Sequence, residues 1–171
     1  MSKKEKKELD LTGHFSADHK LIIKSLKKSQ DYLDNLSEGS NLEKATELLG
    51  TIKKDMKIHF QKEEEILFPA LNRHFERALK KMGTDIRPEG GPVNVMLLEH
   101  KSLWMIIQNL EQAIKNEANK EITSFITQLA ALLRSHIFRE ENVLYVVADA
   151  KIKEKEKAKI SARLRKLSKK M

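Results

Sequence analysis

The sequence contains no cysteine, and it has only six glycines and three prolines among its 171 residues. Without cysteine it can form no disulfide framework, no thiolate zinc site, no cysteine-held iron–sulfur cluster and no cysteine nucleophile. No apolar run approaches the roughly 20 residues that a membrane-spanning helix needs. The charged segment 1–10 also lacks the apolar core of a signal peptide. These absences favour one soluble, cytoplasmic domain.

The excess of positive charge is confined to one end of the chain. The net charge is +8, and segment 151–171 accounts for all of it, with ten Lys or Arg against two Glu. No aromatic residue interleaves with these charges, so stacking on bases has no support and nucleic acid is disfavoured as a partner. Ile160, Leu164 and Leu167 recur at helical spacing. We therefore expect a basic amphipathic helix that covers the rest of the fold, frays into solvent, or docks on a protein partner or an acidic surface.

The scarcity of glycine and proline predicts an all-α domain of about four helices over residues 11–150. The expected helices run from a cap at Ser16 to about Leu36, from Asn41 to a kink or end at Pro69, from Pro92 to a turn at 116–119, and onward from about Asn119. Apolar residues recur every three or four positions along each helix, which is the inward-facing pattern of a bundle. The last stripe reads Ile122, Phe125, Leu129, Leu132, His136, Glu140, Val143 and Val147. Short links favour antiparallel neighbours.

Six positions on these apolar stripes carry side chains that can bind a metal. They are His19, His59, Glu63, His100, His136 and Glu140. Burying two carboxylates without partners would cost on the order of several kcal/mol each. No Lys or Arg occupies the same stripes to neutralise them. One core histidine is most often structural, but six such residues on four facing stripes are better explained by a bound metal.

These residues follow an internal repeat. The pattern His59-x-x-x-Glu63-Glu64-x-x-Leu67-Phe68 recurs 77 residues later as His136-x-x-x-Glu140-Glu141-x-x-Leu144-Tyr145, and Asp18-His19-Lys20 recurs as Glu99-His100-Lys101. A spacing of four places a histidine and a glutamate on one helix face, one turn apart, where both can reach the same centre. Two such hairpins facing each other would bring four imidazoles and two carboxylates to one point.

Imidazole and carboxylate ligands without thiolate suit iron, manganese or zinc. If both glutamates bridge, the six side chains make four contacts to each of two metals. A bridging oxo or hydroxo group adds a fifth contact and leaves a position for a small ligand. A tetrahedral zinc site would use only four of the donors. Ferritin-like centres use four Glu and two His, so the present set is less negative and should favour reversible binding or sensing over oxygen activation.

The order of these residues resembles the hemerythrin-like, or HHE cation-binding, domain over roughly residues 11–150. The resemblance implies an up-and-down four-helix bundle, extended here by the basic C-terminal helix. It also implies two non-haem iron ions, held by His19, His59, His100 and His136 and bridged by Glu63 and Glu140. Oxygen-carrying hemerythrins have another histidine where this chain has Trp104. The chain is therefore similar to the four-His, two-Glu subset, which includes iron sensors and proteins linked to nitric oxide or di-iron repair.

Two functional hypotheses follow. The first is a di-iron protein that reversibly binds or senses oxygen, nitric oxide or iron. The alternative is a di-iron enzyme of oxidative or nitrosative stress that turns over peroxide or nitric oxide, or repairs iron centres; whether the chain is an enzyme stays open. Glu64 and Glu141 are expected to face solvent, with a place beside the metal as the alternative. Trp104 is expected in the core above the site, and His14 and His74 at the surface.

Overall fold

The structure is a computed structural model that describes residues 11–34, 41–81 and 91–168. Every regular element in these segments is helical, and none is a β-strand, which confirms the all-α prediction for this part of the chain. The elements are α2 (Leu11–Asp34), α3 (Asn41–Lys62), η1 (Glu63–Leu67), α4 (Phe68–Lys81), α5 (Pro92–Lys115), α6 (Asn119–Arg139), η3 (Glu140–Leu144), α7 (Tyr145–Lys151) and α8 (Glu154–Ser168). Among these described helices, none is long and apolar enough to cross a membrane.

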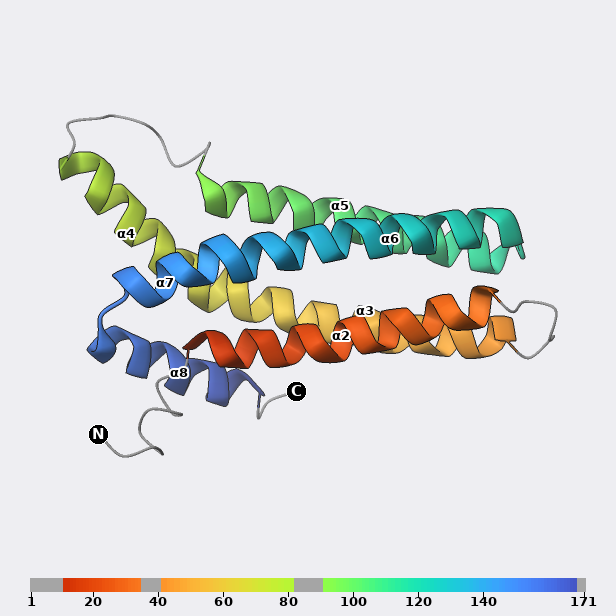
Figure 1. Cartoon of the computed structure of the whole chain (residues 1–171), viewed down its shortest axis with the longest axis horizontal. Helices are drawn as coiled ribbons and strands as arrows, with labels where there is room; N and C mark the ends of the chain where they lie inside the picture. The colour runs from red at the N-terminus through yellow and green to blue at the C-terminus, as the bar shows by residue number, and fades with distance from the viewer. Residues whose placement is uncertain (1–10, 35–40, 82–90, 169–171) are drawn as a thin grey trace.

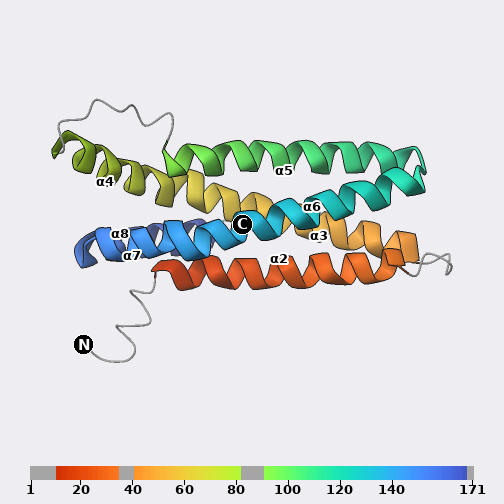
Figure 2. The ribbon, with the colours of Figure 1, turned by 45° about the horizontal axis from the view of Figure 1, so that its top comes forward.

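Helices α2, α3, α5 and α6 lie alongside one another and enclose an apolar core (Figures 1 and 2). Helix α2 packs mainly on α3, and α5 packs mainly on α6, with opposite chain directions within each pair. Each helix buries one stripe, represented by Ile22, Met56, Leu103 and Leu129. The expected starts of α3, α5 and α6 agree with the structure, and Gly91 is the N-cap before Pro92.

The structure differs from the prediction at the start of the first helix and in the core residues of α6. Helix α2 begins at Leu11, so Ser16 lies inside the helix and does not cap it. In α6, Ile126 is fully buried, whereas the expected core residue Phe125 is only partly buried. The expected end of the first helix at Leu36 and the turn segments 37–40 and 82–90 lie outside the described residues.

Two continuous helical runs, α3–η1–α4 and α6–η3–α7, each carry a His-x-x-x-Glu pair. Both runs change from α-helix to π-helix at the glutamate. The π-helical turns η1 and η3 begin at Glu63 and Glu140. The backbone N–H of Phe68 donates to the carbonyl of Glu63, and that of Tyr145 donates to the carbonyl of Glu140. These bonds reach back five residues instead of four, which widens the turn and adds a residue to it. The internal repeat therefore extends to the backbone.

The π-helical turns change which side chains face inward. Val143, expected in the core, is 51% exposed, whereas Leu144 is buried, because the extra residue in the turn rotates the stripe. Pro69 follows η1, and α4 leaves the line of α3 there, which agrees with the expected kink (Figure 1). In the second half of the repeat, Val146 occupies the position after η3 that Pro69 occupies after η1. The π-helical turn therefore does not depend on proline.

The C-terminal helix α8 covers one end of the fold. Its residues Ile160 and Leu164 are buried in a second core cluster, together with Leu11 and Leu67. Glu156 of α8 also pairs with Arg73 of α4 at 3.0 Å. Segment 151–171 was expected to cover the fold, to fray into solvent or to dock on a partner or an acidic surface. The structure places its described part on the fold, with most of its lysines exposed.

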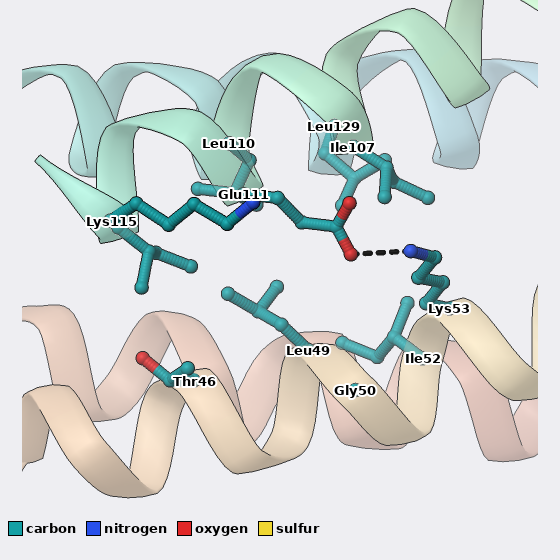
Figure 3. A pocket seen from close by; sticks show the side chains of 11 residues that line it. Thr46, Leu49, Gly50, Ile52, Lys53, Ile107, Leu110, Glu111, Lys115 and Leu129 are labelled. Atoms are coloured by element: carbon teal, nitrogen blue, oxygen red, sulfur yellow. Dashed lines mark hydrogen bonds and ion pairs between the residues drawn. The ribbon is translucent and has the colours of Figure 1, made fainter.

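A cavity of about 370 Å³ separates α3 from α5 (Figure 3). Leu49, Ile107 and Leu110 line its apolar floor, and an ion pair between Lys53 and Glu111 crosses it. None of the six predicted metal ligands lines it.

Candidate metal centre

The six side chains predicted to bind metal lie together inside the protein, and each is at most 2% exposed. They come from six different elements: His19 from α2, His59 from α3, Glu63 from η1, His100 from α5, His136 from α6 and Glu140 from η3. The six side chains converge because each one lies on the inward-facing side of its helix, at the same level of the core.

The donor atoms form two groups that share the carboxylate of Glu140. Glu63, His100, His136 and Glu140 each place a donor atom within 4.8 Å of the others, and His19, His59 and Glu140 do the same. The two oxygens of Glu140 face different groups: Oε1 lies 2.9 Å from Nε2 of His136, and Oε2 lies 3.0 Å from Nε2 of His19. This arrangement suits a carboxylate that bridges two ions.

Glu63 is placed differently. Its Oε2 lies 3.4 Å from Nε2 of His100 and 3.5 Å from Nε2 of His59. Its Oε1 accepts a hydrogen bond of 2.8 Å from the hydroxyl of Tyr145. One oxygen of Glu63 therefore faces the histidines, and the other is already engaged.

Two outer nitrogens of the histidines contact acids from the neighbouring helix. Nδ1 of His59 lies 3.4 Å from Oδ2 of Asp18, and Nδ1 of His136 lies 2.9 Å from Oε2 of Glu99. Each acid directly precedes the histidine of its own helix. The acid that precedes the histidine of one helix thus orients the histidine of the next helix. The repeat displayed both acids, but sequence reasoning assigned them no role.

The other two outer nitrogens contact acids that follow the ligand glutamates. Nδ1 of His100 lies 2.7 Å from Oε1 of Glu64, and Nδ1 of His19 lies 3.0 Å from Oε1 of Glu141. Both acids are about two-fifths exposed, at 43% and 41%. They face solvent as expected, but they also take the alternative place beside the histidines.

A cation supports each acid that precedes a histidine. Nζ of Lys62 lies 2.7 Å from Oδ2 of Asp18, and Arg139 pairs with Glu99. Burial raises the pKa of Asp18, but hydrogen bonds with His59 and Lys62 outweigh it, so the pKa lies below its usual range. Asp18 is therefore held as a carboxylate.

Several inner atoms of this arrangement lack hydrogen-bond partners, although Nε2 of His19 and Nε2 of His59 lie within hydrogen-bond distance of each other, at 2.9 Å. Because each Nδ1 faces a carboxylate, it is assigned a proton, so in the neutral form of each ring Nε2 is the nitrogen left with a lone pair. Nε2 of His100, Nε2 of His136, Oε2 of Glu63 and both carboxylate oxygens of Glu140 are buried without hydrogen-bond partners among the described residues. Such groups normally have partners. A bound cation would satisfy all of them, so the donor set fits a metal.

The comparison with known families agrees with this geometry. The family model of the hemerythrin HHE cation-binding domain matches residues 10–148, which include both halves of the repeat. The chain belongs to this family. No curated protein matched it. Membership of the hemerythrin HHE family indicates cation binding, and the two buried His/Glu groups are places that could hold a metal.

Without a metal, protons neutralise the centre of this HHE domain. Burial lowers the pKa of His59, but Glu63, Asp18 and Glu140 outweigh it and raise the pKa to about 10. Burial also lowers the pKa of His136, but the contact with Glu140 outweighs burial, so the pKa of His136 is raised as well. Burial raises the pKa of Glu140, but the histidines around it hold the pKa well below its usual range. A metal would have to displace these protons.

The remaining candidates lie outside the two groups. Trp104 is partly buried and meets Phe60 edge-on with ring centroids 6.0 Å apart, and Phe60 in turn stacks on His100 at 3.7 Å. Trp104 therefore packs one ring away from the HHE centre. His14 is partly buried on α2. His74 was expected to be solvated, but its ring lies 3.1 Å from Glu156, and it belongs to the contact between α4 and α8.

Proposed function

We propose that this HHE domain is an up-and-down four-helix bundle that holds two iron ions and reversibly binds or senses oxygen, nitric oxide or iron. The observation that carries the proposal is a set of buried atoms that face one another without hydrogen-bond partners among the described residues, namely Nε2 of His100 and His136, Oε2 of Glu63 and both carboxylate oxygens of Glu140. Two iron ions bound there would supply a redox-active pair to which a small diatomic ligand can attach. The ligands would be His19, His59, Glu63, His100, His136 and Glu140.

Each side chain has a distinct task in this proposal. His100 and His136 would hold one ion, and His19 and His59 the other, with Glu140 shared between them. The acids on the outer nitrogens fix the ring orientations and the proton positions before a metal arrives. Because the six side chains are at most 2% exposed, the centre suits ligands of diatomic size.

Metal analysis of anaerobically purified protein tests the proposal. We expect about two iron ions per chain, and optical spectra that change on adding air or nitric oxide. His59→Ala and His136→Ala should each reduce the bound iron. His74→Ala is the matched control, because His74 is bonded to Glu156 away from the centre. Unchanged iron in both ligand variants would contradict the ligand assignment.

The same protein separates binding from catalysis. An assay with a stoichiometric amount of reductant should show one binding event per centre if the function is reversible binding. Repeated turnover of peroxide or nitric oxide, or net transfer of iron to an acceptor, would instead support the enzymatic alternative.

We also propose that the outer face of α8 binds an acidic surface. A groove of about 420 Å³ between α4 and α8 is lined by Arg73, Lys153, Lys155, Lys159 and Arg163, with Glu156 as its acid. Removing residues 151–171 would also remove core side chains, so charge reversal is the cleaner test. Lys155→Glu with Lys159→Glu should abolish binding to vesicles of anionic phospholipid without changing the iron content. Binding that persists would contradict this proposal.

A further inference from the structure

The cavity between α3 and α5, which we call the α3–α5 cavity, is lined mainly by aliphatic side chains. Six of its eleven lining residues are leucine or isoleucine, and none of the eleven is aromatic. Ile52, Leu110 and Leu129 are its deepest residues and are at most 2% exposed, whereas Gly50 and Lys115 at its mouth are exposed. A cavity of about 370 Å³ with an apolar lining and a few polar groups is typical of small-molecule sites.

The α3–α5 cavity is elongated along the two helices. On α3 its lining runs from Thr46 to Lys53, and on α5 it runs from Ile107 to Lys115. At 1.5 Å per residue, these stretches are about 10 to 12 Å long. Thr46 and Lys115 lie toward one end, and Lys53 lies toward the other (Figure 3). An alkyl chain fits such a cavity better than a flat ring does, because the lining offers no aromatic side chain for stacking.

A second cavity, of about 280 Å³, lies in the equivalent place between α2 and α6. On α6 it is lined by the residues that follow Thr46, Leu49 and Gly50 by 77 positions, namely Thr123, Ile126 and Thr127. On α2 it is lined by the residues that precede Glu111 and Lys115 by 81 positions, namely Gln30 and Asp34. The two cavities are therefore equivalent positions of the internal repeat.

The two cavities differ in their chemistry. Four charged side chains line the α2–α6 cavity: Lys27, Asp31, Asp34 and Arg134. Nη2 of Arg134 donates to Oε1 of Gln30 at 3.0 Å, which joins α6 to α2. The α3–α5 cavity has glycine in the place of Thr127 and lysine in the place of Asp34. Helix packing explains a gap in both halves, but it does not explain why only one of these two gaps is mainly aliphatic and is flanked by a glycine.

Gly50 keeps the α3–α5 cavity open. It lies in the middle of the α3 face formed by Thr46, Leu49 and Lys53, at spacings of three and four residues. A Cβ placed at Gly50 would meet no atom within 4 Å, so a larger side chain has room to enter the cavity. Glycine is unfavourable inside a helix, and its position here agrees with a need for open space.

The mouth of the α3–α5 cavity carries an excess of positive charge. Lys53 pairs with Glu111 across the cavity. Lys115 has no ion-pair partner among the described residues, so its ammonium group is available to an anion. The apolar walls beside Lys115 exclude water from one side, which strengthens its attraction for a carboxylate.

We propose that the α3–α5 cavity binds a free fatty acid of medium chain length. The alkyl chain lies between Leu49 and Leu110, where it is removed from water. The carboxylate lies at the end of the cavity beside Lys115. None of the six predicted metal ligands lines the cavity, so this site goes beyond the proposed metal function and can be tested separately from it.

Isothermal titration calorimetry of the full chain with octanoate, decanoate and dodecanoate, below their critical micelle concentrations, tests the proposal. One molecule should bind per chain. The affinity should rise about fourfold for each added methylene group while the chain lies inside the cavity. Decanol, which has the chain of decanoate without the charge, should bind about threefold more weakly than decanoate.

Two variants locate the bound molecule. Gly50→Leu should fill the cavity and reduce the affinity for decanoate by about tenfold or more. Gly50→Ala is its matched control, because one methyl group leaves most of the cavity open, and it should retain binding. Lys115→Gln should weaken decanoate to the level of decanol and leave decanol unchanged. Lys101→Gln removes an exposed lysine of the same helix outside the cavity and should change neither affinity.

The outcomes are distinct. No binding below the critical micelle concentration would overturn the proposal, and so would binding that Gly50→Leu leaves unchanged while circular dichroism shows it folded. If Gly50→Leu does not fold, Lys115→Gln at its exposed position tests the same site. Equal binding of decanoate and decanol would overturn the role of Lys115. Binding only to vesicles that contain fatty acid would show attachment to a membrane surface and would also overturn the proposal.

Discussion

The two halves of the domain build the centre with matching parts. In the first half, an acid of α2 orients a histidine of α3, and Lys62 supports the acid; in the second half, Glu99 and Arg139 do the same for α6. The π-helical turns begin at matching glutamates. The halves differ mainly in what contacts each glutamate, because a tyrosine hydroxyl binds Glu63 and none binds Glu140 among the described residues. The repeat thus accounts for the paired donor side chains, and a small departure from it gives the two glutamates different contacts.

The largest expected effect separates these two glutamates. Glu140 turns a different oxygen toward each donor group, whereas Glu63 faces both groups with Oε2 alone. Glu140→Gln should therefore reduce the iron content from about two ions per chain to near zero. Glu63→Gln should retain about one. Metal analysis after anaerobic loading and desalting measures both, and equal losses would show that the glutamates are equivalent.

Substitution of the acids that orient the histidines should have smaller and similar effects in the two halves. Asp18→Asn and Glu99→Gln each remove a charged acceptor from an Nδ1 nitrogen. Each should lower metal affinity by about 10- to 100-fold. Competition with a chelator measures this. Glu111→Gln, at the distant cavity, serves as the control and should leave affinity unchanged. A much larger effect in one half would contradict the equivalence of these acids.

Metal binding should be linked to protons in both halves. The pKa of His59 is about 10 in the folded metal-free protein, above the ordinary 6.5. Its protonated form therefore stabilises the metal-free fold fully below pH 6.5, and this contribution is lost as pH rises through about 10. Because a metal must displace the proton, affinity should increase by up to about tenfold per pH unit for each proton released. Calorimetry in buffers of different ionisation enthalpy counts the protons, and no release at about pH 7.5 would contradict the prediction.

The smallest effect concerns a difference far from the centre. Gly50 in α3 corresponds to Thr127 in α6, and a Cβ added at Gly50 would meet no atom within 4 Å. Gly50→Ala should raise the free energy of unfolding by about 0.5–1 kcal/mol, since alanine restricts the unfolded chain and favours the helix. Urea denaturation measures the change. The iron content per chain should be unaffected, and a destabilised variant would show that the cavity wall is less open.

Much of the fold could be predicted from local pattern. The beginnings at Asn41, Pro92 and Asn119 follow from turn residues and helix periodicity, and the structure agrees with them. The predicted apolar stripe beyond Glu140 was wrong at Val143. The π-helical hydrogen bond, which reaches back five residues, cannot be recognised from an apolar pattern with a period of 3.6 residues. The start at Ser16 was wrong because Leu11 and Phe15, which precede it, are buried in the second core cluster, and this packing outweighs the preference of serine for a helix cap.

The sequence by itself determined the kinds of ligand, their helix faces and their twofold repetition. Those properties are local: a spacing of four residues places His59 and Glu63 on one face whatever lies opposite. The tertiary structure decided which acid orients which histidine, across separations of 36 to 122 residues. It also decided that Tyr145 bonds to Glu63, 82 residues away. Such pairings depend on how the two hairpins pack, and helix periodicity carries no information about that.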